Sequence, residues 1–358
     1  MSLAGRVVCV TGATGFVGTR LVERLLLDQG AAVRALVHNY TSAAWLSRTT
    51  AQLIQGDVTQ QHRLKAAFEG CDLVVHCAAQ MGGTPSRMRE VNVIGTQNVL
   101  QAADDAKVRR VIHISSFAVH GRHLPDGADE TAPLHPGDDV YALTKLQAEE
   151  AVGLYRRDHY LDAVILRPTI IYGPRSQWWT IDPIERIKHN RLALLGRGDG
   201  IANVVYIDDV IDAIMLALEA PRVGGETFLV SASEKITWRD FYGAYASMLG
   251  TTLSEWPVPL AYLVSRVTQQ LDGRIVHLQA AGSPGMWALA PIVGLKLVRK
   301  LAGSMYKLQA WEIPTYRNHG QASVAKAQRM LGFCPRWTLE QAMAETAIWL
   351  KAQGHLPG

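Results

Sequence analysis

A tyrosine and a lysine four positions apart, Tyr141 and Lys145, have the spacing that places both side chains on one face of a helix. A tyrosine phenol has an ordinary pKa of about 10, and a neighbouring ammonium group favours its ionised form. Such a pair could exchange a proton with a substrate as a general acid or base. The spacing is common on surface helices, so the inference needs support from the rest of the chain.

A second candidate site is the glycine-rich segment near the N-terminus. Gly12, Gly15 and Gly18 lie three apart, after an expected strand at 6–11 and at the start of an expected helix at 16–29. Glycines here permit a tight turn and let a pyrophosphate approach the backbone, while the helix N-terminus offers free N–H groups. The segment therefore predicts a dinucleotide phosphate site, with a purely structural turn as the alternative.

The elements that must position these residues alternate between strand and helix. Apolar strands without polar alternation indicate a sheet buried on both faces, and the alternation predicts an α/β fold with a doubly wound parallel (Rossmann) sheet. Strands are expected at 6–11, 32–37, 53–56, 73–77, 110–115 and 163–166, and helices at 16–29, 61–68, 87–105 and 141–157.

Beyond residue 172 proline, glycine and tryptophan become frequent, and the remaining expected helices lie near 208–220, 237–249, 258–271 and 338–353. We expect a dinucleotide-binding domain over 1–172 and a smaller, mostly helical substrate-binding lobe over 173–358. The strand and helix near 203–220 are expected to return to the first domain.

Several motifs occur in one order along the chain: TGATGFVG (11–18), HCAA (76–79), NVIGT (92–96), SSFAVHG (115–121), YALTK (141–145), LRPTIIYGP (166–174) and VYIDDV (205–210). Together they resemble the extended short-chain dehydrogenase/reductase family, also called the NAD-dependent epimerase/dehydratase family. The pattern is most similar to its 3β-hydroxysteroid dehydrogenase and dihydroflavonol reductase-like branch. The segment AKAQRMLGFCPRW (325–337) also looks like the end of this family.

The resemblance implies a role for each catalytic candidate. Tyr141 would exchange a proton with the substrate, Ser116 would bind the reacting oxygen, and Lys145 would tune the tyrosine and hold the nicotinamide ribose. The implied cofactor contacts are Gly12, Thr14, Gly15, Phe16, Val17, Gly18, His38, Asp57, Val58, Ala78, Ala79, Asn92, Ser115, Tyr141, Lys145, Pro168 and Ile171. Two plainer interpretations remain: the serines could be strand-end caps, and Asp57 could be a helix cap.

The dinucleotide is indicated by the end of the second strand, 32–37, where an acidic residue would bind the ribose 2′-hydroxyl and a basic one a 2′-phosphate. The segment holds no Asp or Glu. His38 follows it, where NADP-using relatives tend to carry arginine. The sequence therefore favours NADP as cofactor, with NAD as the alternative.

Three departures from the family pattern narrow the reaction. Phe117 and Ala118 stand where the dehydratases carry Asp-Glu, and neither can act as acid or base. Ile170 and Ala202 stand where nucleotide-sugar enzymes often carry an asparagine and an arginine. We therefore expect an oxidoreductase that interconverts a hydroxyl and a ketone on a hydrophobic small molecule, steroid-like or a secondary metabolite.

A tryptophan-rich second half suits an apolar ligand, although these side chains could equally be core or dimer contacts. The tryptophans concerned are Trp178, Trp179, Trp256, Trp287 and Trp311. Two other functions stay open: a nucleotide-sugar epimerase or reductase, and a non-catalytic redox sensor that binds NADP. The sensor is disfavoured because both Tyr141 and Lys145 are present.

The composition of the chain indicates which kinds of binding partner to expect. The chain has 358 residues, a formal charge of +4 and 48% hydrophobic residues, with scattered basic residues that give no reason to expect nucleic acid. Its four cysteines match no zinc spacing, so we expect no metal site and reduced thiols in a cytoplasmic protein. We expect no signal peptide, no membrane-spanning segment and a homodimer. The basic amphipathic stretch 284–311 could touch a membrane surface, or pack on the substrate lobe or a dimer face.

Overall fold

The computed structural model describes residues 2–259, 261 and 313–357. The chain divides into two compact units. Unit 1 comprises Met1–Tyr172, Asn203–Ser233 and Gly320–Thr338, and unit 2 comprises Gly173–Ala202, Glu234–His319 and Leu339–Gly358. The stretch 284–311, with Trp287 and Trp311, lies outside the described residues, as does nearly all of the expected helix at 258–271.

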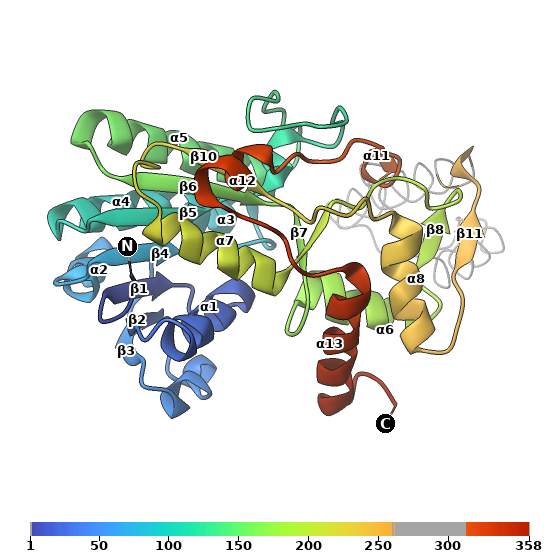
Figure 1. Ribbon diagram of the computed structural model, residues 1–358, viewed down its shortest axis with the longest axis horizontal. Helices are drawn as coiled ribbons and strands as arrows, with labels where there is room; N and C mark the ends of the chain where they lie inside the picture. The colour runs from blue at the N-terminus through green and yellow to red at the C-terminus, as the bar shows by residue number, and fades with distance from the viewer. Residues whose placement is uncertain (1, 260, 262–312, 358) are drawn as a thin grey trace, which may run out of the picture. The chain divides into compact units, whose positions relative to one another are not determined.

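Unit 1 is built on a seven-stranded sheet in which every neighbouring pair is parallel. The strand order is β10-β6-β5-β4-β1-β2-β3 (Figure 1). The order reverses between β1 and β4, which in doubly wound sheets is where ligands bind. The predicted doubly wound fold is confirmed. The strands are β1 Val7–Thr11, β2 Ala32–Val37, β3 Gln52–Gln55, β4 Leu73–His76, β5 Arg110–Ile114, β6 Ala163–Pro168 and β10 Thr227–Val230.

Helices of unit 1 surround this sheet (Figure 1). A short parallel pair, β7 (Ile170–Tyr172) and β9 (Val204–Tyr206), completes the unit. The helices are α1 Phe16–Leu27, α2 Gln61–Phe68, α3 Pro85–Arg89, α4 Gly95–Asp105, α5 Val140–His159, α7 Ile207–Glu219 and α12 Ala325–Leu331.

One continuous apolar cluster joins the sheet to α2, α4 and α5. Val74, Val111 and Ile165 project from three strands and meet Leu100 of α4 and Val152 of α5. Residues two apart on a strand share a face, so this pattern follows directly from the unbroken apolar strands of the sequence. The cluster fixes α5, which carries the candidate catalytic pair, against β5.

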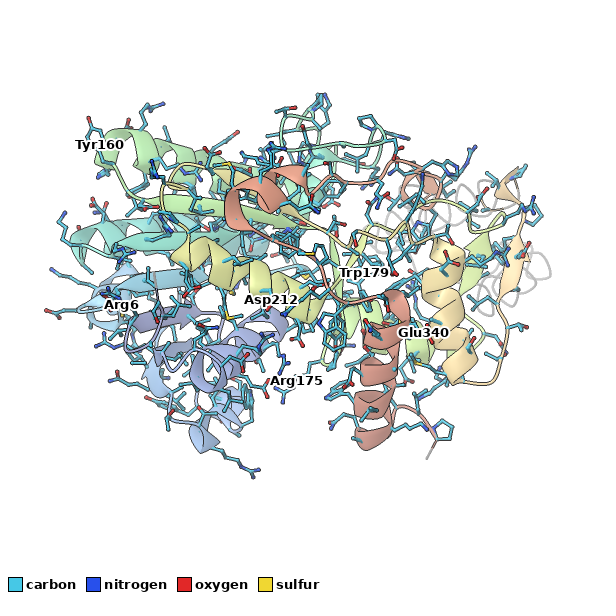
Figure 2. The ribbon with its side chains drawn as sticks, viewed as in Figure 1. Arg6, Tyr160, Arg175, Trp179, Asp212 and Glu340 are labelled. Atoms are coloured by element: carbon cyan, nitrogen blue, oxygen red, sulfur yellow. The ribbon has the colours of Figure 1, made fainter. Side chains whose placement is uncertain are left out.

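Ion pairs join α1, the helix after the glycine loop, to α7. Arg20 binds Asp208 through two hydrogen bonds of 2.6 and 2.9 Å. One turn later Arg24 donates to Asp212 at 3.1 Å, and Arg336 also binds Asp212 (Figure 2). These contacts attach α1 to α7.

The single helix expected over 87–105 is interrupted. Thr84 caps α3, whose first residue is Pro85, and the helix then widens into a π-helical turn at Glu90–Ile94 before α4 begins. Such turns often occur at functional sites because they redirect side chains. Here the turn carries Asn92, one of the predicted cofactor residues.

Unit 2 is mostly helical. It contains α6 Asp182–Lys188, α8 Trp238–Met248, α11 Ile313–Tyr316 and α13 Leu339–Ala352, with a π-helical turn at Gln177–Ile181 and the parallel strands β8 Ala193–Leu195 and β11 Ser254–Trp256. Among the described residues, none of the helices is both long and apolar enough to cross a membrane.

An aromatic cluster forms part of the core of unit 2. The Trp238 ring lies 6.1 Å from that of Trp179, 5.3 Å from Tyr242 and 4.6 Å from Tyr316, centroid to centroid. Figure 2 marks Trp179 in this unit. Trp178, in contrast, is 55% exposed. Trp179 therefore serves the packing of the unit, as the plainer interpretation of these tryptophans holds.

Candidate active site

The glycine loop joins β1 to α1 and leaves the helix N-terminus open. Gly15 precedes the helix, no side chain among the described residues caps it, and the first turn holds no acidic residue. Gly12 has a φ of +65°, which L side chains rarely adopt. A Cβ on Gly18 would overlap the Gly12 carbonyl. The loop is therefore a bare backbone cradle with free N–H groups, which suits a pyrophosphate.

The loop after β4 packs closely against this cradle. A Cβ on Gly12 would lie 2.7 Å from the Ala78 nitrogen, so the two backbones touch. The Thr11 hydroxyl accepts from the Ala78 N–H at 3.4 Å and lies 2.7 Å from His76 Nδ1. The small residues Ala78 and Ala79 thus follow β4 at the reversal of the strand order, where the sequence predicted cofactor contacts.

The structure brings the three catalytic candidates together at the ends of β5 and α5. Tyr141 lies close enough to Ser116, which directly follows the strand, for the serine hydroxyl to affect the pKa of its phenol. Lys145 is 1% exposed, and its ammonium group donates to the Ile114 carbonyl at 2.6 Å. Asp139 caps α5 by accepting from the Ala142 N–H at 3.1 Å, and the helix begins at Val140, one residue before the tyrosine.

Burial dominates the electrostatics of this pair. It raises the pKa of Tyr141 to about 12, against the opposing effect of the Ser116 hydroxyl, and Asp139 raises it further. Burial also lowers the pKa of Lys145 to about 8, although Glu149 acts in the opposite direction. The lowering of the tyrosine pKa that the sequence suggested is therefore not present in this structure, because Lys145 directs its ammonium group at Ile114.

At the expected adenosine end, three ionisable side chains converge. His38 follows β2, is 68% exposed and lies 3.2 Å from the Asp57 carboxylate, which Arg87 of α3 approaches to 3.7 Å. The other carboxylate oxygen accepts from the Thr59 N–H and hydroxyl, both at 2.9 Å. Burial raises the pKa of Asp57, but the bonds from Thr59 and the charges of His38 and Arg87 outweigh it, and the pKa lies below its usual value.

This geometry refines two expectations. Asp57 accepts from Thr59 in the turn that begins with it, but the N-cap of the following helix α2 is Gln60, so the helix-cap interpretation is wrong. The second carboxylate oxygen of Asp57 faces His38. Arg87 was missed, since nothing in its sequence context links it to the end of β2. Val58 packs against α4, where a Cβ on Gly95 would lie 2.7 Å from its side chain.

Asn92 is fully buried and ties two segments to the catalytic helix. Its amide accepts from the Gln80 N–H at 2.7 Å and donates to the Gln80 carbonyl at 3.0 Å. It also donates to the Thr144 hydroxyl at 2.9 Å. All three of these bonds go to protein, so direct contact with a cofactor stays a prediction for this residue.

The remaining predicted cofactor residues lie in or next to the elements that surround the glycine loop and the catalytic candidates. Pro168 ends β6, and Ile171 lies in β7. Thr14 lies in the glycine loop, and Phe16 and Val17 begin α1. Ser115 lies between Ile114 and Ser116, but its hydroxyl donates to Glu149 of α5. Within the described ranges no group of His, Cys, Asp and Glu could hold a metal ion.

This combination of parallel sheet, glycine cradle and serine-tyrosine-lysine group defines a nucleotide-dependent oxidoreductase class, and comparison with known proteins identifies the family. Residues 8–231 match the model of the NAD-dependent epimerase/dehydratase family, well over half of the chain. The protein belongs to this family, as the motifs predicted. Its place in the 3β-hydroxysteroid dehydrogenase-like branch stays a prediction.

Relatives in the family carry out different reactions. The chain is 32% identical over 237 residues to the 4-hydroxy-2-methyl-3-oxo-4-farnesyl-3,4-dihydroquinoline-1-oxide ketoreductase of Stigmatella aurantiaca, covering 65% of this chain and 70% of the relative. It is 28% identical over 273 residues to the UDP-glucose 4-epimerase of Vibrio cholerae, covering 71% and 79%. Among solved structures, UDP-glucuronic acid 4-epimerase from Bacillus cereus in complex with NAD superposes with a TM-score of 0.73 at 21% identity, covering 96% of each chain. That likeness shows the shared fold.

Proposed function

We propose that the protein is an NAD(P)-dependent oxidoreductase that interconverts a hydroxyl and a ketone on a hydrophobic small molecule. The observation that carries this proposal is the contact of Tyr141 with Ser116, with Lys145 buried one turn further along the same helix. The nicotinamide, when bound, supplies or accepts the hydride. Unit 1 is proposed as the dinucleotide-binding part and unit 2 as the substrate-binding part.

Each side chain has a defined task in ketone reduction. The Tyr141 hydroxyl gives its proton to the carbonyl oxygen as that oxygen gains charge, and the Ser116 hydroxyl donates a hydrogen bond to the same atom. For this the high pKa of Tyr141 must fall. A turn of the Lys145 ammonium group from Ile114 towards the phenol would lower it, because a nearby positive charge favours the phenolate.

The residues around the catalytic group favour an apolar ketone. Phe117 and Ala118 follow Ser116 and offer no acid or base for dehydration, and Ile170 offers no hydrogen bond to a sugar-nucleotide phosphate. The similarity to a ketoreductase named for a farnesylated substrate supports the same substrate class. A steroid-like molecule or a secondary metabolite would meet these requirements.

The proposed cofactor is NADP, with NAD as the alternative. His38 and Arg87 place two basic groups at the end of β2, and Asp57 lies between them. A 2′-phosphate would compete with the Asp57 carboxylate for both. We further propose a homodimer in the cytoplasm, and contact of 284–311 with a membrane surface remains a separate hypothesis.

A second candidate is a nucleotide-sugar epimerase, favoured by the similarity to the Vibrio cholerae enzyme. It would need a site for a nucleoside diphosphate. Calorimetric titration with UDP and dTDP separates the two functions: binding with micromolar affinity would favour the epimerase, and its absence the ketone reductase.

The main test is oxidation of NADPH and NADH against a panel of ketones that includes steroids, flavonoids and long-chain 3-oxo compounds. Tyr141→Phe should lower turnover by at least about 100-fold, the usual worth of a positioned general acid, with little change in cofactor affinity. Tyr160→Phe is the matched control, because Tyr160 is 91% exposed beyond the other end of α5 (Figure 2). Tight cofactor binding without turnover of any ketone would refute the proposal and favour a redox sensor.

A further inference from the structure

A buried ion pair lies behind the catalytic residues. Glu149 follows Lys145 by one turn of α5 and is 7% exposed, and Arg167 of β6 is 5% exposed. The Arg167 guanidinium donates to the carboxylate of Glu149 at 2.6 Å and 2.9 Å. The same carboxylate accepts from the Ser115 hydroxyl. Both charged side chains are buried.

The ion pair is held from a third side. Arg167 also lies 3.1 Å from His120 Nε2 and donates to the Glu130 carbonyl at 3.4 Å. His120 ends the short helical turn at Phe117–His120 that begins directly after Ser116. The strand end and the turn that follows it are therefore both attached to the ion pair.

One face of α5 binds three consecutive residues at the end of β5. Lys145 binds the Ile114 carbonyl and Glu149 binds the Ser115 hydroxyl. The contact of Tyr141 with Ser116, described above, is the third. Since the helical residues are spaced by four, each turn of the helix holds one strand residue. The position of Ser116 relative to the phenol thus depends on the contact made by Glu149.

A buried ion pair is a costly way to join two elements. Removing two charges from water costs several kcal/mol for each ion, and apolar residues of similar volume are often at least as stabilising. Packing alone therefore gives no reason for a carboxylate here. The negative charge of Glu149 does act on Lys145: it raises the pKa of the lysine, against the effect of burial.

The other titratable groups around Lys145 are neutral near pH 7. On β4 and β5, burial lowers the pKa of His76 to about 3 and that of His113 well below its ordinary value. After β4, burial raises the pKa of Cys77 to about 12. Among the described groups whose charge acts on Lys145, Glu149 is therefore the one that is ionised near pH 7.

We propose that Glu149, held in place by Arg167, is a positioning residue that keeps Lys145 in its ammonium form and fixes Ser116 beside Tyr141. Its relevance to catalysis rests on the proposed function, because only a bound nicotinamide ribose and a phenol give the ammonium group a task. The effect on Lys145 itself is a property of the cofactor-free protein.

The proposal is tested by titrating Lys145 directly. Protein labelled with ¹³C-lysine is followed by NMR over pH 6–11 without cofactor, and the Lys145 signal is assigned by its loss in Lys145→Met. Glu149→Gln preserves the volume and an acceptor for Ser115 but removes the charge. It should lower the titration midpoint of Lys145 by about one pH unit, as expected for the loss of one nearby opposite charge.

The matched control is Glu150→Gln, which removes the same charge from the adjacent, exposed position of α5. It should leave the midpoint unchanged, and Glu149→Asp should largely restore the wild-type midpoint. Equal midpoints in Glu149→Gln and wild type would overturn the proposal. If Glu149→Gln does not fold, the double variant Glu149→Gln/Arg167→Met removes both buried charges. Its midpoint should still shift downward, by less than one unit, because the loss of the positive charge of Arg167 acts in the opposite direction.

A second readout connects the effect to function. The Kd of NADPH is measured by fluorescence from pH 6 to pH 10 in the same variants. Affinity should fall with rising pH as Lys145 loses its proton, and the fall should occur about one unit lower in Glu149→Gln. A uniform loss of affinity at all pH values would indicate a merely structural role and refute the proposal. If the wild type binds neither NADPH nor NADH, the proposed function fails, while the lysine titration still decides the present inference.

Discussion

Lys145 is buried, and burial disfavours the charged form of its side chain. Its pKa of about 8 compares with 10.5 for an ordinary lysine. Replacement by methionine removes the titrating group and keeps the length of the side chain. The variant also loses the bond to Ile114, whose weakening when Lys145 is deprotonated is already contained in the pKa of the folded state. The pH dependence of stability therefore isolates the buried charge.

The magnitude follows from the two pKa values. A difference of this size corresponds to about 3 kcal/mol of destabilisation when the lysine is protonated in both the folded and unfolded states. Above pH 8 the folded protein releases the proton while the unfolded chain retains it. Stability from this group therefore rises with pH, by about 2 kcal/mol between pH 7 and pH 9.5. Lys145→Met lacks this gain.

The assay is urea unfolding of the cofactor-free protein at both pH values. The difference in unfolding free energy, variant minus wild type, should fall by about 2 kcal/mol from the lower to the higher pH. The matched control is Lys351→Met, at an exposed position of α13, which should show no such change. A difference that stays constant with pH, within about 0.5 kcal/mol, would refute the reasoning that burial governs Lys145.

Two further predictions concern the cofactor. Gly12→Ala should weaken NADPH binding at least about tenfold by calorimetry, because the new Cβ would meet the Ala78 backbone at a φ that alanine rarely adopts. Gly153→Ala, at an open helical position, should instead stabilise the protein by about 0.5–1 kcal/mol and leave the Kd of NADPH unchanged. Equal NADPH affinities in the two variants would contradict the role of Gly12 in the phosphate site. Arg87→Ala should weaken NADPH about tenfold more than NADH if it contacts a 2′-phosphate, while equal losses for both would remove that role.

Much of the fold follows from local signals. The strands of unit 1 are short apolar runs, and the glycines and the tyrosine-lysine pair act through spacings within one turn or one helix. These features need no distant partner, so the cradle before α1 and the place of Tyr141 on α5 could be inferred from the residues alone. The π-helical turn within 85–105 could not be inferred, because no local residue signal in that stretch marks where the helix widens.

The charged partners of the site depended on tertiary structure. Arg87 approaches Asp57 from a different helix, and Arg167 reaches Glu149 from β6. No fixed sequence spacing predicts such pairs, because they form only when the sheet brings separate segments together.

The sequence by itself determined the family, the strand pattern and which side chains can do chemistry, because those depend on residue type and short spacing. Only the tertiary structure decided the pKa values of these groups. Burial moves the pKa of Tyr141 up and that of Lys145 down, and Glu149 opposes the second shift. Desolvation and Coulomb forces depend on what surrounds a group in space, and the chain acquires those surroundings only by folding.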